Sequence, residues 1–231
     1  MDESEHRILA QFCKTHLDFS KLTFDGYYQH LPLCVIDAVF SIGAHYTSTR
    51  NTVEKFAQHF KLDAHLVEAV PSVKGQVQLR FLIEAYDKLG VNFLTETVYQ
   101  NRQRTSTRNG ILKSEAVLRF SRVLDQYGIR YIQDVDSVIG QSAFERAIQQ
   151  IPGQTSGVCL RYFYILAGSS EHVKPDRMIL RFIQSALGKV VSAEQGHRYV
   201  VEACKILQQT YPSLTPAILD NQIWNYQRLQ R

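Results

Sequence analysis

Ile151-Pro152-Gly153-Gln154-Thr155-Ser156-Gly157 is the stretch that decides the fold of this chain of 231 residues. Before it, Phe144, Ala147 and Ile148 share one helical face, and after it residues 157 to 167 are apolar on almost every side. An apolar stripe is typical of a helix that packs on one face, whereas an all-apolar helix is buried by its neighbours. The stretch therefore predicts a short turn between two helices, the second of which is central.

Helical spacing of apolar residues continues along nearly the whole chain, and no sustained period-two pattern indicates a sheet. Residues 33 to 44 form a second apolar run and predict another buried helix. We expect an all-α protein of about ten helices. Glycines expected to end helices are Gly90, Gly128, Gly168 and Gly188. Residues expected to begin helices are Ser114, Asp176, Ser192 and Thr215.

The composition excludes several classes of protein. The hydrophobic content of 45% is ample for a packed core, and the net charge of +4 is too small by itself to require a polyanionic partner. The four cysteines lie far apart, without a CxxC pair or a histidine at ligand spacing. We therefore expect reduced, buried cysteines, with no metal ion and no cofactor.

Neither a membrane segment nor a targeting segment is expected. No run approaches the roughly 18 apolar residues of a membrane helix. The segment from Met1 to His6 has neither the basic nor the apolar region of a signal peptide. We expect a soluble, cytoplasmic protein, and no residue pattern specifies its oligomeric state.

The turn after Ile151 has the composition of a phosphate-binding hairpin. Backbone N–H groups at a helix start bind phosphate, and small residues let a nucleic-acid backbone approach closely. Gly153, Thr155 and Gly157 would supply the amides, and Ser156 would add a hydroxyl donor. An ordinary tight connection between antiparallel helices explains the same residues.

A basic, hydroxyl-rich loop extends from Gln100 to Lys113 and contains no acidic residue. Arginine with short hydroxyl and amide side chains is the usual composition of contacts to a phosphate backbone. We expect this loop to bind DNA, although a solvated loop is the simpler alternative. Its candidate phosphate ligands are Arg102, Arg104, Arg108 and Lys113.

Asp176 is the candidate catalytic residue. It follows Pro175 and precedes an apolar stripe, so it is well placed to cap a helix by accepting backbone N–H bonds. A carboxylate in a cleft can also orient a water molecule and stabilise positive charge on a sugar as a base departs. Lys174 is a possible amine nucleophile if it is desolvated, and otherwise an ordinary surface lysine.

Three residues near the first buried helix are pocket candidates. Asp37 lies inside an apolar run, where an ionised carboxylate needs a partner; we expect an arginine or a backbone group, with a role in a ligand pocket as the alternative. His45 and Tyr46 follow that run and are suited to stack on a base, or alternatively only to close the helix.

The order of these parts resembles the helix-hairpin-helix DNA glycosylase superfamily, with its endonuclease III-like fold. The resemblance covers residues 31 to 190 and is most specific from Ile151 to Arg181. It implies an all-α fold of two lobes: a central helical lobe of residues 32–168 that contains the hairpin, and a second lobe of residues 1–31 plus 169–231. In that family the hairpin holds duplex DNA while a flipped base enters a pocket between the lobes.

The resemblance also implies a reaction. An Asp at the position matched by Asp176 promotes cleavage of the N-glycosidic bond. Thr155 stands where the hairpin usually has a second glycine, and Gly157 stands where bifunctional members have a lysine nucleophile. The four-cysteine iron-sulfur motif of many relatives is absent from the sequence. What is implied is a monofunctional base-excision N-glycosylase, without lyase activity, that removes damaged bases with an Asp-assisted water.

A second function is compatible with the same residues. A catalytically inactive DNA-binding or protein-interaction module of this fold would need Asp176 only as a helix cap. The two functions differ in whether duplex DNA is bound only or also loses a base.

Overall fold

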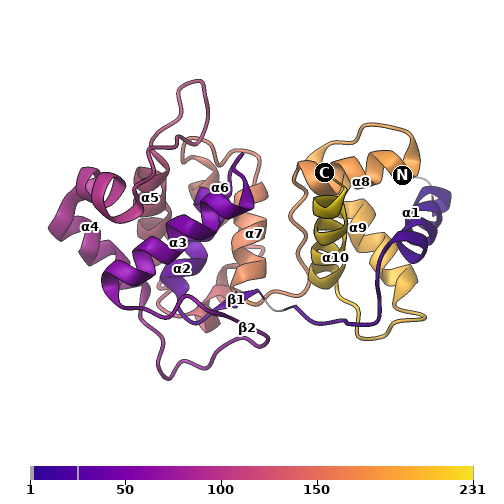
Figure 1. Ribbon diagram of the computed structural model, residues 1–231, viewed down its shortest axis with the longest axis horizontal. Coiled ribbons are helices and arrows are strands. Elements are labelled where there is room, and N and C mark those ends of the chain that lie inside the picture. Colours follow the sequence, from indigo (N-terminus) through magenta and orange to yellow (C-terminus); the bar gives the residue numbers. More distant parts are fainter. Residues whose placement is uncertain (1–2, 25, 231) are drawn as a thin grey trace. The chain divides into compact units, whose positions relative to one another are not determined.

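The computed structural model describes residues 3–24 and 26–230 and is mostly helical, which confirms the all-α prediction (Figure 1). None of its described helices is long and apolar enough to cross a membrane. The α-helices are α1 (Glu3–His16), α2 (Leu31–Phe40), α3 (Tyr46–Phe60), α4 (Leu79–Phe93), α5 (Lys113–Gln126), α6 (Ser142–Gln149), α7 (Val158–Leu166), α8 (Arg177–Leu187), α9 (Ala193–Leu207) and α10 (Pro216–Leu229). A π-helix (Leu94–Tyr99), a 3-10 helix (Ile132–Val138) and two strands, β1 (Tyr27–Tyr28) and β2 (Leu66–Val67), complete the fold.

The chain divides into two compact units. The central unit is Asp25–Gly168, and the terminal unit combines Met1–Phe24 with Ser169–Arg231. Each unit has its own hydrophobic core. The boundary expected near residue 32 lies earlier, because Tyr28 is buried in the central core and β1 pairs with β2.

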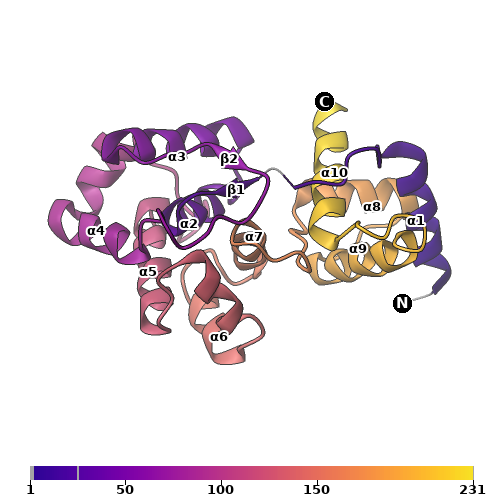
Figure 2. The ribbon, with the colours of Figure 1, turned by 90° about the horizontal axis from the view of Figure 1, so that it is seen from below.

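Helix α2 is the middle of the central unit, where α3, α5 and α7 pack around it (Figure 2). Its sequence LPLCVIDAVF explains this position, because Asp37 is the only charged residue in an otherwise apolar helix. Every residue of the helix is buried. Pro32 lies in the first turn, where a helix needs no N–H from it. The two-residue strands were not predicted, since two residues are too few for a period-two pattern.

Glycine ends several helices as expected. Gly188 caps α8 in the left-handed conformation at φ +68°, and Gly128 and Gly168 also have positive φ. Gly90 interrupts α4 at φ +79°, but the chain then continues into the π-helix. The helix expected to be capped near Ser114 begins one residue earlier, at Lys113, and Ser114 is buried in its first turn and does not cap it.

The terminal unit consists of α1, α8, α9 and α10, with α1 and α10 each packed against both α8 and α9. Its helix starts follow the sequence rules. Ser192 forms a capping box with Gln195 before α9, and the Thr215 side chain accepts the Ile218 N–H before α10. All four cysteines of the chain are buried, and none of them is in a disulfide.

Candidate functional site

The turn between α6 and α7 is held by three short backbone hydrogen bonds. Ile151 N–H donates to Ile148 O at 3.0 Å, Gln154 N–H to Ile151 O at 2.9 Å, and Gly157 N–H to Gln154 O at 3.0 Å. Gly153 and Gly157 have φ of +89° and +70°. Other residues reach this region only with strain, so both glycines are required by the backbone of the turn.

The start of α7 has no side-chain cap from its N-cap residue, and its first amide, Val158 N–H, donates to Ser156 Oγ only at a long 3.4 Å. Gly157 is its N-cap and has no side chain to satisfy the first amides of the helix. Within the described residues, the amides of Gly153, Thr155 and Ser156 donate to no acceptor, and all three residues are exposed. Gly157 itself was expected to offer its amide to a phosphate, and that expectation was wrong, because its N–H is bonded to Gln154 O.

The basic loop packs directly on this turn. A Cβ on Gly153 would lie 2.4 Å from Thr105 Cβ and 2.7 Å from Thr105 Oγ1, so only glycine fits at this contact. The two arms of the loop pair through their backbones. Thr105 N–H donates to Ile111 O at 2.9 Å, and Arg104 and Leu112 form an isolated antiparallel β-bridge. The structure thus brings together two features that are about fifty residues apart in the sequence.

Three arginines of the loop are exposed, as a contact to phosphate requires. Arg102 forms an ion pair with Glu96 at 2.7 Å, and Arg104 Nη1 donates to Gly110 O at 2.6 Å. The Arg108 side chain has no hydrogen bond or ion pair among residues 3–24 and 26–230. Arg108 is therefore the cation of this loop most available to an external anion.

Lys113 is not a surface cation, and its assignment to DNA binding was wrong. Its exposed fraction is only 2%, and its ammonium donates to Phe40 O at 2.8 Å, Ile42 O at 2.7 Å and Gln103 Oε1 at 2.8 Å. An ammonium has three N–H donors, and all three are used here. Lys113 therefore closes the C-terminal end of α2 and fastens the loop to it.

Two buried polar side chains at the junction of loop and turn lack partners. Gln154 is 1% exposed, and neither its amide nitrogen nor its oxygen has a hydrogen bond. Thr105, 6% exposed, has an unbonded hydroxyl. A buried polar atom without a partner costs about 1–3 kcal/mol. The junction thus has unused hydrogen-bonding capacity next to the open amides.

Asp176 lies in the terminal unit and caps α8, as predicted. Its Oδ1 accepts Met178 N–H at 2.7 Å and Ile179 N–H at 3.3 Å. Its Oδ2 accepts no hydrogen bond from any residue that the structure describes, and the side chain is half-buried. One carboxylate oxygen therefore maintains the helix start while the other is available to a ligand or a water molecule.

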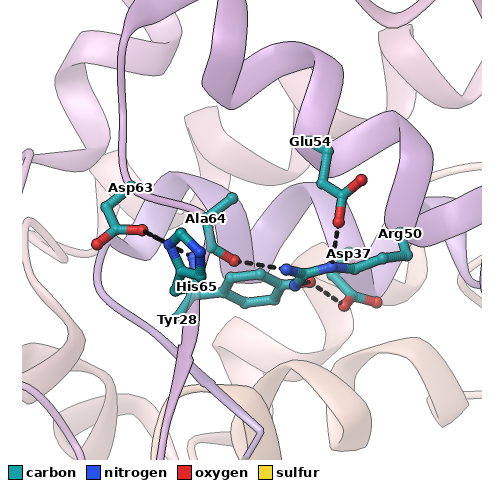
Figure 3. Close-up of polar contacts among 7 residues, drawn as sticks. All are labelled: Tyr28, Asp37, Arg50, Glu54, Asp63, Ala64 and His65. Carbon is teal, nitrogen blue, oxygen red and sulfur yellow. Dashed lines mark hydrogen bonds and ion pairs between the residues drawn. The ribbon is translucent and has the colours of Figure 1, made fainter.

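Asp37 has structural partners. Tyr28 Oη donates to its Oδ2 at 2.7 Å, and the Tyr162 hydroxyl also bonds to it (Figure 3 shows the Tyr28 side). Burial first, and then the charge of Asp37, raise the pKa of both tyrosines well above the ordinary value. Both hydroxyls therefore stay protonated as donors. The partner of Asp37 is a pair of tyrosines.

Arg50 extends this network outward. Its Nη1 approaches Tyr28 Oη at 3.4 Å, its Nη2 donates to Ala64 O at 2.8 Å and its Nε to Glu54 Oε1 at 2.8 Å (Figure 3). A hollow of about 290 Å³ lies beside it, lined by Arg50, Glu54, Ala57, Gln58, Leu62, Asp63, Ala64 and His65. Among the described residues no group of three acidic, histidine or cysteine side chains is placed to bind a metal ion.

The remaining pocket candidates, His45, Tyr46 and Lys174, lie in different surroundings. His45 is an exposed residue at the start of α3 and contributes no side-chain cap. Tyr46, 44% exposed, lies close enough to Tyr162 to help raise the pKa of that tyrosine. Lys174 is partly buried, and its backbone N–H donates to Asp220 Oδ1 at 2.9 Å.

Residues 7–228 match the model of a family described as a domain of unknown function. The chain belongs to the DUF8548 family. No curated protein and no solved structure matches it.

Several side chains of this DUF8548 chain were not singled out from the sequence. Arg177 and Arg181 are exposed on α8, four residues apart, and therefore lie on one face of the helix that Asp176 begins. Their i, i+4 spacing could have been recognised. Gln154, Asp220 and Tyr162 had no such signal, since only tertiary packing makes them buried partners or neighbours of site residues.

Proposed function

We propose that this DUF8548 protein binds the backbone of duplex DNA with the turn 151–157 and the loop 100–113. The packing of Thr105 on Gly153 carries the proposal, because it places the loop that bears the exposed arginines against the turn that has the open amides. Backbone amides at a helix start and arginine side chains are both phosphate ligands. The amides of Gly153, Thr155 and Ser156, the Ser156 hydroxyl and the guanidinium of Arg108 form the core of this set.

We further propose that Asp176 assists hydrolysis of an N-glycosidic bond, as a monofunctional DNA N-glycosylase. The bond between C1′ and the base nitrogen breaks with both electrons going to the base, which takes up a proton. The water oxygen bonds to C1′ and releases its proton to Asp176 or to solvent. Asp176 supports this role with a carboxylate oxygen that the helix cap leaves unused. Gly157 offers no amine, so no lysine-dependent lyase step follows.

A non-enzymatic module is the second candidate. The observation in its favour is that Asp176 is fully explained as the N-cap of α8, a role worth about 1 kcal/mol. DNA would then be bound without loss of a base.

The chemistry is tested with duplex oligonucleotides that carry uracil, an alkylated base or an oxidised base. Wild type is expected to release one of these bases, and Asp176→Asn is expected to lose at least 100-fold in rate. Asparagine caps helices as well as aspartate does, so this variant keeps the fold and the duplex affinity. Binding without release across the whole panel would reject the enzyme and favour the module.

The interface is tested by the salt dependence of duplex binding. Arg102→Gln, Arg104→Gln and Arg108→Gln together should lower the slope of log affinity against log salt by roughly 2–3. The matched control changes three exposed cations elsewhere in the central unit, Lys74→Gln, Arg80→Gln and Lys88→Gln, with the same loss of charge. Equal slopes for the two triple variants would show that binding follows net charge and not this loop.

A further inference from the structure

Asp220 is a buried carboxylate that the proposed function does not yet use. It lies in the first turns of α10, 9% exposed, and its Oδ1 accepts the Lys174 N–H at 2.9 Å. This hydrogen bond joins residues 46 positions apart in the chain. It therefore ties the backbone just before α8 to α10.

The segment that leads to Asp176 is fixed to α10 at two points. Ala217 N–H donates to Ser170 O at 3.0 Å, and Asp220 holds Lys174 further along. Between them Val173 is fully buried. Asp176 N–H then donates to Lys174 O at 2.6 Å. The path from α10 to the candidate catalytic residue thus consists of consecutive short hydrogen bonds.

Helix α9 supports the same segment. A Cβ on Gly196 would lie 3.6 Å from Pro175 Cβ and 2.7 Å from Leu180 Cδ2, so the α9 backbone packs against the residues on either side of Asp176. Pro175 has no N–H to donate and a fixed φ, which removes one freedom of the backbone here. Asp220 accepts the N–H of the residue just before the proline, Lys174.

The electrostatics agree with this arrangement. Burial first, and then the charge of Asp176, raise the pKa of Asp220 well above the ordinary carboxyl value, and the Lys174 N–H and ammonium oppose this in part. A protonated Asp220 carboxyl would still accept the backbone N–H through its carbonyl oxygen.

We propose that Asp220 is the positioning residue for Asp176, because it fixes the Lys174–Asp176 backbone from α10 and so aims the carboxylate at the start of α8. The inference rests on the proposed role of Asp176 in base release. Asp220 acts through the backbone and does not touch the substrate. The Asp220 Oδ1 atom accepts an N–H, and the side-chain oxygen of an asparagine would accept it equally well.

The test compares Asp220→Asn with Asp220→Ala in the oligonucleotide assay. Asparagine keeps the acceptor, so its kcat is expected to stay within about twofold of wild type, while alanine is expected to lose at least tenfold in kcat with KM unchanged. Leu207→Ala, a core change in the same unit, controls for general loss of stability. An equal loss of kcat in Asn and Ala, or in Leu207→Ala at matched stability, would overturn the proposal.

A second readout does not depend on catalysis. Hydrogen exchange of the Lys174 amide should be slow in wild type and Asp220→Asn and at least tenfold faster in Asp220→Ala. If no variant releases a base, the proposed function fails, and this exchange then decides the positioning role alone. Equal exchange in all three proteins would show that Asp220 does not hold this backbone.

Discussion

Helices α7 and α8 begin in opposite ways. Each helix start has unsatisfied N–H groups and a partial positive charge. In α8 the Asp176 carboxylate occupies those N–H groups, whereas in α7 the N-cap is Gly157, which has no side chain. The amides of Gly153, Thr155 and Ser156, shortly before α7, are also without acceptors in the described chain.

The start of α7 can therefore accept an external anion, whereas the start of α8 already has the carboxylate of Asp176. Under the proposed function, an external phosphate would meet free N–H donors at the turn before α7, against which the arginine-bearing loop packs through Thr105. At α8 a phosphate would meet a carboxylate, while a water molecule or a developing positive charge would be favoured. Under the proposed function, the contrast places backbone binding in the central unit and bond cleavage in the terminal unit.

Gly153→Ala should produce the largest effect, because it breaks the junction of turn and loop. Positive φ costs a non-glycine residue about 1–2 kcal/mol, and the overlap with Thr105 adds about 1–3 kcal/mol. We expect a loss of about 4 kcal/mol in the free energy of unfolding, measured in urea. Gly128→Ala is the control, with φ +78° and no atom within 4 Å of the added Cβ. Equal losses in the two variants would mean that Thr105 does not pack on the turn.

Lys113→Met should cost about 3 kcal/mol, because it leaves the carbonyls of Phe40 and Ile42 buried without donors. Lys88→Met, at an exposed position, should change stability by less than about 0.5 kcal/mol. Urea unfolding measures both. If Lys113→Met were as stable as Lys88→Met and weakened duplex binding instead, Lys113 would be a phosphate ligand after all.

Gly157→Asp converts the open start of α7 into a start like that of α8. Asp and Asn both tolerate positive φ, so Gly157→Asn has the same backbone strain without the charge. A Cβ here meets only the Gln149 side chain at 3.4 Å. We expect duplex affinity at low salt about tenfold weaker for Asp than for Asn, with the gap narrowing as salt rises. Equal affinities would contradict a phosphate site at α7.

Asp220→Asn should have the smallest effect, and its sign depends on pH. The pKa of Asp220 is raised by burial and by Asp176, so above about pH 4 the unfolded chain loses this proton while the folded protein keeps it. The free energy of unfolding of the wild type therefore falls as the pH rises. Thermal unfolding should show the Asn variant about 1 kcal/mol more stable at pH 7, and equal to wild type near pH 3. A less stable Asn variant at pH 7 would show that the ionised carboxylate is favoured.

Local rules of sequence predicted much of the fold. The capping box at Ser192, the left-handed Gly188 and the cap at Asp176 depend on residues within four positions of each other, and all three are as expected. Periodicity also identified α2 and α7 as buried helices. It could not set the boundary near residue 25, which depends on the pairing of β1 with a strand about forty residues away.

The candidate site was harder to predict, because burial there comes from distant contacts. Lys113 belongs to a segment with the composition of a basic loop. Its side chain nevertheless points into the protein, toward the carbonyls of Phe40 and Ile42 some seventy residues earlier. Asp37 was expected to have an arginine or backbone partner. The hydroxyls of Tyr28 and Tyr162 bond to it, and Arg50 contacts Tyr28. Asp220 gave no signal, since its role depends on a single bond to Lys174.

The most direct test of the contrast between α7 and α8 is an amide NMR titration with an undamaged DNA duplex. The amides of Thr155 and Ser156 should shift downfield as they donate to phosphate, while those of Met178 and Ile179, already bonded to Asp176, should stay close to their free positions. Unshifted Thr155 and Ser156 amides at saturating duplex would contradict the account.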